Sequence, residues 1–304
     1  MGNKHLIIIL GPTASGKTET ALKIAGHFNT HILSADSRQF YREISIGTAK
    51  PGKEHLSQIK HYFINSLSIE EDYNVARFEE EALNIIEKIH NSKDVAVMAG
   101  GSGLYIDAVC YGIDEFPDAD PEIREKIRKD FREKGLEYIQ EWLKELDPVY
   151  YSRVDLDNPN RIRRALEVCL QTGKPYSVQR LNKPKKRSFN IVKIGLELPR
   201  EKLHERINRR VDEMIEKGLT DEARRVCPYR ELNSLNTVGY KELFRYFDGE
   251  ISLDRAIEDI KTNTRRYARR QLTWFSRDDS INWFSAGCID KMIEFLKEVI
   301  KKRA

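Results

Sequence analysis

The sequence predicts an α/β fold in which a parallel β-sheet is flanked by helices. Apolar runs that read as strands occur at residues 6–10, 31–36, 94–105 and 190–199, with helical periodicity between them. Gly11 follows the first run, Asp36 ends the second, and glycines lie within the third. A charged segment without strand-like runs interrupts the alternation at about 114–189. Alternating strands and helices are typical of doubly wound sheets, whose ligands bind at the carboxyl ends of the strands.

The composition fits a protein with a large buried core. The chain has 304 residues, of which 40% are hydrophobic and 33% charged. No apolar run approaches the ~18 residues that a membrane span needs, and we expect no membrane partner. The four cysteines are far apart and form no C-x-x-C pair. We therefore expect reduced thiols and a cytoplasmic location.

The first strand leads into a phosphate-binding loop and then a helix at 17–28. The loop has the pattern G-x-x-x-x-G-K-[ST], and its residues are Gly11, Pro12, Thr13, Ala14, Ser15, Gly16, Lys17 and Thr18. In such loops the backbone N–H groups and the lysine hold phosphates, and the Ser/Thr hydroxyl binds Mg²⁺. The sequence therefore predicts a P-loop NTPase-like parallel sheet core flanked by helices, with an inserted all-helical domain.

The next two strands depart from the usual nucleoside triphosphatase pattern. Such enzymes have a second strand that ends in an acid for Mg²⁺. Here the apolar strand at 95–99 is followed by Gly100 and Gly101 instead. Asp36 is the only acid at a strand end. It has three interpretations: a ligand of Mg²⁺-bound water, a general base, or a helix N-cap. The glycines at 100, 101 and 103 allow either a close ligand or a tight turn.

Two breaker stretches separate the helical segment from the rest. "GIDEFPDADPE" is rich in Pro and Asp, and "RLNKPKKRSF" is rich in cations. We expect a discontinuous core domain at 1–113 and 190–304, with a helical insertion at 114–189.

The segment 261–277 has six cations and no acid. On a helix, Arg265/Arg269 and Arg266/Arg270 form two basic columns. Such columns repel themselves unless an anion is present. With interleaved aromatic residues they suit RNA; the alternative is a solvated face, with Trp274 and Phe275 in the core.

Six segments in chain order carry a resemblance to a known family. They are GPTASGKT (11–18), SADSRQFYREISIGTAKP (34–51), AGGSGLYIDAV (99–109), NPNRIRRALEV (158–168), NTVGYKEL (236–243) and RRYARRQLTWF (265–275). Together they resemble the bacterial tRNA dimethylallyltransferases, also called tRNA isopentenyltransferases. The second segment is much more specific than the phosphate loop.

The resemblance implies a reaction. The dimethylallyl group of dimethylallyl diphosphate is transferred to N6 of the adenine on the 3′ side of the anticodon (position 37), in tRNAs that read codons beginning with U. Mg²⁺ is the expected cofactor. The insertion is expected to contact the anticodon stem-loop, and the protein is expected to be a monomer.

The resemblance also implies site residues. Asp36, Lys17 and Thr18 would be catalytic, and Thr18 would hold the metal. The donor diphosphate would contact the loop from Gly11 to Thr18 and, by a looser alignment, Arg224. The tRNA would contact Asp36, Ser37, Arg38, Gln39, Ser102, Arg124, Asn160, Arg161, Ile162, Arg163 and Arg164, and the basic columns add Arg266 and Arg270.

Two other functions share parts of this pattern. A small-molecule kinase explains the loop, Asp36 and the glycines, but not the basic segments. A nucleotide-gated RNA-binding module explains the basic segments and leaves Asp36 without a role.

Overall fold

The structure is a computed structural model that describes residues 4–181 and 183–302. The chain divides into two compact units. A core unit comprises Met1–Cys110 and Lys186–Ala304, and a second unit comprises Tyr111–Lys185. The boundaries expected from the sequence, 113/114 and 189/190, fall near these. Residues 1–3 and 303–304 of the expected core and residue 182 of the expected insertion lie outside the described residues.

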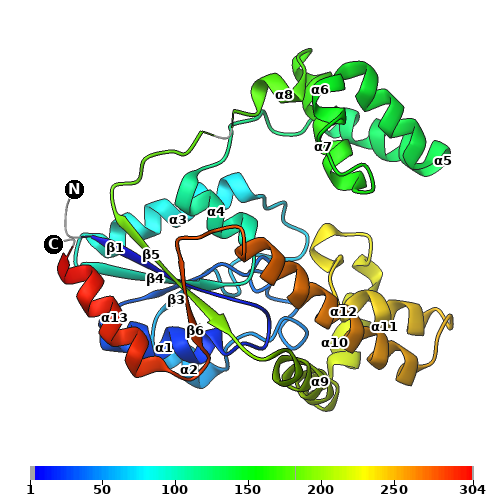
Figure 1. Cartoon of the computed structure of the whole chain (residues 1–304). Helices are drawn as coiled ribbons and strands as arrows, with labels where there is room; N and C mark the ends of the chain where they lie inside the picture. Colours follow the sequence, from blue (N-terminus) through cyan, green and yellow to red (C-terminus); the bar gives the residue numbers. More distant parts are fainter. Residues whose placement is uncertain (1–3, 182, 303–304) are drawn as a thin grey trace. The chain divides into compact units, whose positions relative to one another are not determined.

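The core unit is built on a six-stranded parallel sheet with the order β3-β2-β4-β1-β5-β6 (Figure 1). Its strands are β1 (His5–Leu10), β2 (Ile32–Ser34), β3 (His61–Tyr62), β4 (Val95–Gly100), β5 (Asn190–Glu197) and β6 (Ile281–Ser285). This confirms the predicted parallel sheet. The sequence did not predict β3 and β6, because two short edge strands with half-exposed residues lack a long apolar run.

Helices cover both faces of the sheet because successive strand residues point to opposite sides. Leu6 and Ile8 of β1 pack into one core cluster, and Ile7 and Ile9 into the other. The core-unit helices are α1 (Lys17–His27), α2 (Lys53–Gln58), α3 (Val75–His90), α4 (Gly103–Tyr111), α9 (Arg200–Glu216), α10 (Leu219–Val226), α11 (Tyr240–Phe247), α12 (Leu253–Phe275) and α13 (Ile289–Lys302), with short 3₁₀ helices η1 (Cys227–Tyr229) and η2 (Asn233–Leu235).

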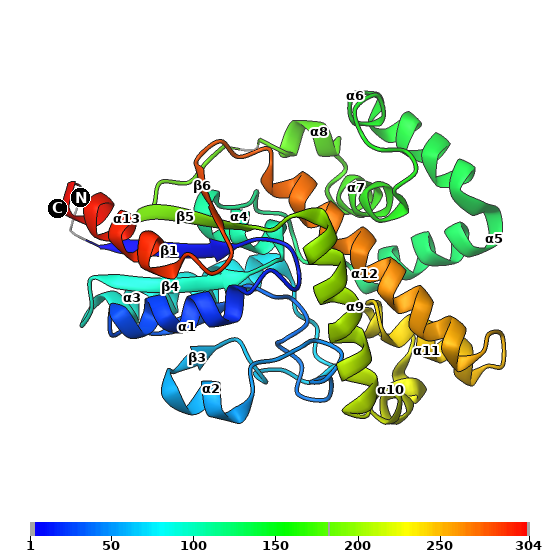
Figure 2. The same cartoon turned by 60° about the horizontal axis from the view of Figure 1, so that its bottom comes forward.

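Helices α9 and α12 lie beyond the carboxyl ends of the central strands in both views (Figures 1 and 2). They therefore stand where an α/β sheet binds its ligands.

The second unit contains α5 (Pro121–Leu146), α6 (Pro148–Tyr151), α7 (Pro159–Thr172) and α8 (Tyr176–Gln179). Three of them begin at an Asp-Pro or Asn-Pro pair. Asp120, Asp147 and Asn158 accept N–H bonds as N-caps, and proline suits the first helical position. The helices enclose their own apolar core around Ile139 and Ile162.

Two expectations from composition can be compared with the described part of the chain. None of its helices has the length and apolar character to cross a membrane. All four cysteines are free thiols, as expected.

Candidate active site

The sheet brings three segments to one edge. β1 lies beside β4, and β4 lies beside β2, so the loop after β1, Asp36 after β2 and the glycine turn after β4 are neighbours. The Ala35 N–H donates to the Ala99 carbonyl (2.8 Å), and the Ser102 N–H donates to the Ala35 carbonyl (3.2 Å). The site therefore forms at the strand ends, where the sequence placed it.

The phosphate loop is held from outside by α9 and α12. Ala14 has a φ of 64°, a left-handed conformation that non-glycine residues rarely adopt. Its side chain is only 7% exposed and packs against Leu203 and Ile207 of α9 and Ala268 of α12. The loop's unusual backbone is thus supported by residues that lie far along the chain.

Lys17 carries the charge of the loop. Its Nζ donates to the carbonyls of Gly11 (3.0 Å) and Pro12 (2.7 Å). Burial lowers the pKa of Lys17 to about 8, while nearby Asp36 raises it and Arg210 lowers it. A partly buried ammonium beside a second cation is costly without an anion, so the site favours an anionic ligand.

Asp36 occupies the boundary of two cavities. One cavity is also lined by Thr13 and Arg210, and the other by Lys17 and Thr18. The Oδ1 atom accepts the Arg38 N–H (3.0 Å). A turn rather than a helix follows Asp36, so the helix N-cap interpretation is wrong. A carboxylate has about four lone-pair sites, so this bond leaves acceptor capacity for a substrate.

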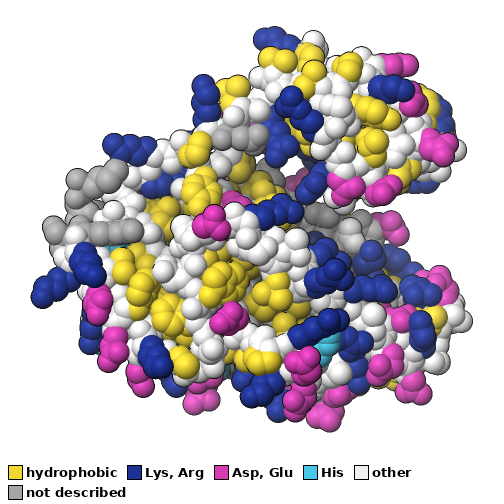
Figure 3. Space-filling model, viewed as in Figure 1, with side chains coloured by type: hydrophobic (Ala, Val, Ile, Leu, Met, Phe, Trp, Pro, Cys, Tyr) yellow, Lys and Arg dark blue, Asp and Glu magenta, His cyan; other side chains and the backbone are white. Residues whose placement is uncertain are grey.

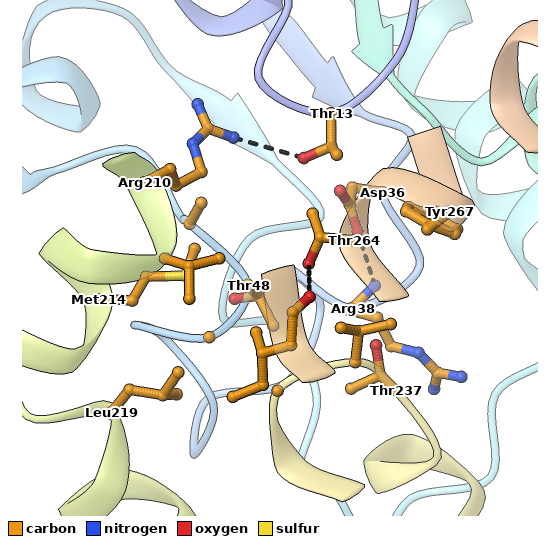
Figure 4. Close-up of a pocket in the computed structure, with 16 residues that line it drawn as sticks. Thr13, Asp36, Arg38, Thr48, Arg210, Met214, Leu219, Thr237, Thr264 and Tyr267 are labelled. Carbon is orange, nitrogen blue, oxygen red and sulfur yellow. Dashed lines mark hydrogen bonds between the residues drawn. The ribbon is translucent and has the colours of Figure 1, made fainter. Parts of the chain in front are cut away.

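The first of these cavities, of about 110 Å³, has a polar and an apolar part (Figure 4). Figure 4 shows Thr13, Asp36 and Tyr267 on one side of it and Met214 and Leu219 on another. The apolar lining comes from Val211, Met214, Leu219, Val238 and Ile260. One cavity therefore offers charged groups and apolar surface to the same ligand.

The arginine at the loop is Arg210, not Arg224. Arg210 donates to the Thr13 hydroxyl (3.5 Å), and burial lowers the pKa of its guanidinium. Arg206, one turn earlier on α9, has its Nη1 3.9 Å from where a Cβ on Gly16 would lie. Arg224 is exposed on α10, with its guanidinium 4.3 Å from the centre of the Phe247 ring. Arg206 and Arg210 are four residues apart on the amphipathic helix α9, and this spacing was the sequence signal that could have identified them.

Arg38 has a structural task. Its guanidinium donates to the carbonyls of Asn233 (2.9 Å), Ser234 (3.1 Å) and Asn236 (3.3 Å). It thereby ties the turn after Asp36 to the segment before α11, although it also lines the larger cavity.

Ser37, Gln39 and Ser102 also lie around Asp36. The Ser102 hydroxyl accepts the Ser37 N–H (3.1 Å), and Gln39 accepts a bond from Ser34 (3.0 Å). Gln39 lines the smaller cavity. These three residues, which we expected to contact the tRNA, are brought together with Asp36.

The glycine turn is shaped by α12. A Cβ on Gly101 would lie 2.1 Å from Gln271, and one on Gly103 would lie 2.3 Å from Trp274. Gln271 accepts the Thr13 N–H (2.8 Å) and donates to the Gly101 carbonyl (2.9 Å). A Cβ at either position would displace a side chain of α12, so the two glycines let α12 approach closely. Gln271, which the sequence analysis missed, joins this turn to the phosphate loop.

One arginine of the two basic columns on α12 differs from the others. Arg265 donates to Asn208 of α9 (2.6 Å) and is half-buried, so it is a packing residue. Arg266, Arg269 and Arg270 are exposed. Figure 3 shows Lys and Arg side chains gathered over the side of the core unit that carries α12.

The aromatic residues of α12 divide likewise. Phe275 is buried and Trp274 donates to Asp107 (2.9 Å), as the core interpretation expected. Tyr267 lines the larger cavity. Burial and the Asp36 charge raise the pKa of Tyr267 to about 12, so its hydroxyl keeps its proton.

The expected tRNA residues of the second unit have different environments. Ile162 is fully buried in that unit's core, so its expected contact with tRNA is wrong. Arg124 and Arg164 both bind Glu167, at 3.3 and 3.2 Å. Arg161 is exposed.

Asn160 and Arg163 bind each other. The Asn160 side chain is exposed and its oxygen accepts a bond from Arg163, whose guanidinium lies 5.4 Å from the centre of the Phe131 ring. Both residues lie in the N-terminal part of α7.

Similar proteins point to one family. The IPP transferase family matches residues 39–278. A relative from Azobacteroides pseudotrichonymphae genomovar. CFP2, named tRNA dimethylallyltransferase 2, is 52% identical over 288 residues, covering 95% of this chain and 94% of its own. The tRNA dimethylallyltransferase of Christiangramia forsetii is 51% identical over 282 residues, covering 93% of each chain.

Solved structures agree. A tRNA isopentenylpyrophosphate transferase from Bacillus halodurans has a TM-score of 0.73 at 34% identity, covering 99% of this chain and 98% of its own. A eukaryotic dimethylallyltransferase described as acting on tRNA has a TM-score of 0.78 at 26% identity, covering 94% of this chain and 75% of its own. The kinase alternative is not favoured. The chain belongs to the IPP transferase family, the tRNA dimethylallyltransferases.

Proposed function

We propose that the chain transfers the dimethylallyl group of dimethylallyl diphosphate to N6 of the adenine at position 37, in tRNAs that read codons beginning with U. The observation that carries the proposal is the place of Asp36. Its carboxylate lies between a phosphate loop with a half-buried lysine and a cavity that is charged at one side and apolar at another.

The donor's two parts match this arrangement. Its diphosphate would bind the N–H groups of the loop, Lys17 and Arg210. Its apolar tail would lie against Val211, Met214 and Leu219. The diphosphate gains negative charge as the C–O bond breaks, so the two cations bind the transition state more tightly than the substrate.

Mg²⁺ fits the site through Thr18. No group of three or more Asp, Glu, His or Cys side chains that could hold a metal occurs among the described residues. Thr18 lies in the first turn of α1 and lines the smaller cavity with Asp36. Mg²⁺ commonly binds through one or two protein groups and the substrate's phosphates. When bound, it would neutralise charge on the leaving diphosphate.

The acceptor adenine must leave its stack of bases in the tRNA to reach Asp36. Enzymes that modify a base flip it out of the stack. N6 would then attack the allylic carbon, the C–O bond would break, and Asp36 would take the proton lost by N6. An exocyclic amine is a weak nucleophile, so much of the rate must come from positioning.

The second unit and α12 would bind the tRNA. We propose that Arg124, Asn160, Arg161, Arg163 and Arg164 of the second unit contact the anticodon stem-loop. Exposed arginines on α12 would contact phosphates.

The test is transfer of label from radioactive dimethylallyl diphosphate to unmodified tRNA in the presence of Mg²⁺. The unaltered chain should label the tRNA, and Asp36→Asn should reduce the rate about 10²–10⁴-fold, the usual size of general-base catalysis. Asp94→Asn is the control, since Asp94 is exposed just before β4, at the opposite edge of the sheet. Unlabelled tRNA with the unaltered chain, or full activity of Asp36→Asn, would contradict the proposal.

A further inference from the structure

A buried carboxylate lies behind the larger cavity, on Glu222 of α10, and the transfer step does not use it. We propose that Glu222 is a positioning residue, whose carboxylate locks three walls of the donor cavity and thereby sets the affinity for the dimethylallyl tail. This inference rests on the proposed function.

Glu222 binds three successive backbone N–H groups. Its Oε2 accepts those of Ser45 (2.8 Å) and Ile46 (2.9 Å), and its Oε1 accepts that of Gly47 (3.0 Å). The side chain is 3% exposed. Successive N–H groups that converge on one point form an anion-binding nest. The anion here belongs to the protein, so the nest serves to fix the loop.

Tyr240 completes the same site. Its hydroxyl donates to Oε1 of Glu222 (2.6 Å), and its side chain is fully buried at the start of α11. A Cβ on Gly47 would lie 2.6 Å from the Tyr240 hydroxyl. Gly47 is therefore required for this close approach, and the loop and α11 meet at the carboxylate.

Each segment that Glu222 joins also lines the cavity. The loop contributes Gly47, Thr48 and Ala49, α10 contributes Leu219, and the residues before Tyr240 contribute Thr237, Val238 and Gly239. Figure 4 shows Leu219 and Thr237 on the side of the cavity opposite Thr13. Glu222 thus fixes walls that face the apolar tail, while the diphosphate is held by the loop of 11–18.

The charge and both oxygens matter. Four donors point at Glu222, and a carboxylate can accept all four because it has about four lone-pair sites. In Glu222→Gln, an NH₂ group would face two of these donors, leaving buried groups unpaired. The shape of the side chain would be kept, so the change acts on the walls rather than on core volume.

The experiment compares Glu222→Gln, Tyr240→Phe and a control, Glu79→Gln. Glu79 is also buried and pairs with Arg187 (2.7 Å), but it does not line the cavity. For each variant one measures Tm, kcat, the KM values for dimethylallyl diphosphate and tRNA, and the inhibition constant of inorganic pyrophosphate.

For Glu222→Gln we expect the KM for dimethylallyl diphosphate to rise about tenfold, because a displaced wall weakens binding of the tail equally in the ground and transition states, which raises KM alone. The pyrophosphate inhibition constant, kcat and the KM for tRNA should stay within about twofold. Tyr240→Phe keeps the three N–H bonds and should shift the same KM by about threefold. Glu79→Gln should lower Tm without changing any of them.

Three outcomes would overturn the inference. One is an unchanged donor KM in folded Glu222→Gln and Tyr240→Phe. Another is a parallel loss of pyrophosphate binding, and the third is the same KM shift in Glu79→Gln. If Glu222→Gln does not fold, Tyr240→Phe decides. Failure of the unaltered chain to label tRNA contradicts the proposed function instead.

Discussion

The two sides of the candidate site are built in different ways. The phosphate loop consists of eight consecutive residues between a strand and a helix. The opposite side is Arg210 on α9, which reaches Thr13 across 197 positions of sequence. The loop alone indicates a phosphate ligand. The residues that come from far away decide what else that ligand carries.

The charges of the two sides are unbalanced. Burial lowers the pKa values of both Lys17 and Arg210, and each is close to Asp36. Two cations facing one carboxylate leave a positive excess in a place where charge is poorly solvated. A multiply charged anion such as a diphosphate would relieve this cost, and the two sides would then bind it together.

Removal of the long-range partner, Arg210, should have the largest effect. We expect Arg210→Ala to lower kcat/KM for dimethylallyl diphosphate about 10²–10³-fold, the size seen when one donor to a developing anion is lost. Arg224→Ala is the matched control, because Arg224 is exposed and its guanidinium contacts the Phe247 ring. Single-turnover transfer to tRNA measures both. A larger loss of kcat/KM with Arg224→Ala would mean that Arg224, as expected from the sequence, binds the diphosphate.

The titration of Lys17 tests the contribution of the phosphate loop to binding of the diphosphate. Its pKa of about 8 means that the free protein loses the Lys17 charge as the pH rises above 8. Bound diphosphate raises that pKa, so binding takes up a proton above pH 8 and weakens with increasing pH. We expect the donor KM to rise by up to about tenfold per pH unit above 8. Lys17→Arg should remove the slope, and a flat KM from pH 7 to 9.5 would contradict the lowered pKa.

Residues near each other in sequence were predictable, and their distant partners were not. The loop, Asp36 and the glycine turn follow from strand ends and short motifs. Gly101 leaves room for the side chain of Gln271, which approaches it from 170 positions away, and no local pattern shows this. Ile162 was assigned to tRNA because it lies within a segment, 160–164, that resembles a tRNA-contacting part of the family, but helical periodicity directs its side chain into a core.

Gln271 tests whether the phosphate loop depends on a distant residue to hold its position. Replacing it with Leu leaves the Thr13 N–H and the Gly101 carbonyl without their partner, so the loop should lose its fixed position. We expect kcat/KM for the donor to fall about tenfold. Gln271→Glu keeps an acceptor for Thr13 and should lose less. A fall in Tm with unchanged kinetics in Gln271→Leu would mean that Gln271 stabilises the fold alone.

The smallest effect should come from the outer face of α12. Arg266 and Arg270 are exposed, so replacing both with Ala should weaken tRNA binding by only a few-fold at moderate salt. The reason is counterion release: each phosphate contact adds about 0.7–0.9 to the slope of log K against log salt, so the slope should shrink by about 1.5. Arg245→Ala with Arg255→Ala removes the same charge, but these arginines already pair with Glu250 and Asp259, so that slope should hold. Equal slopes in the two double variants would mean that net charge, and not this face of α12, attracts the tRNA.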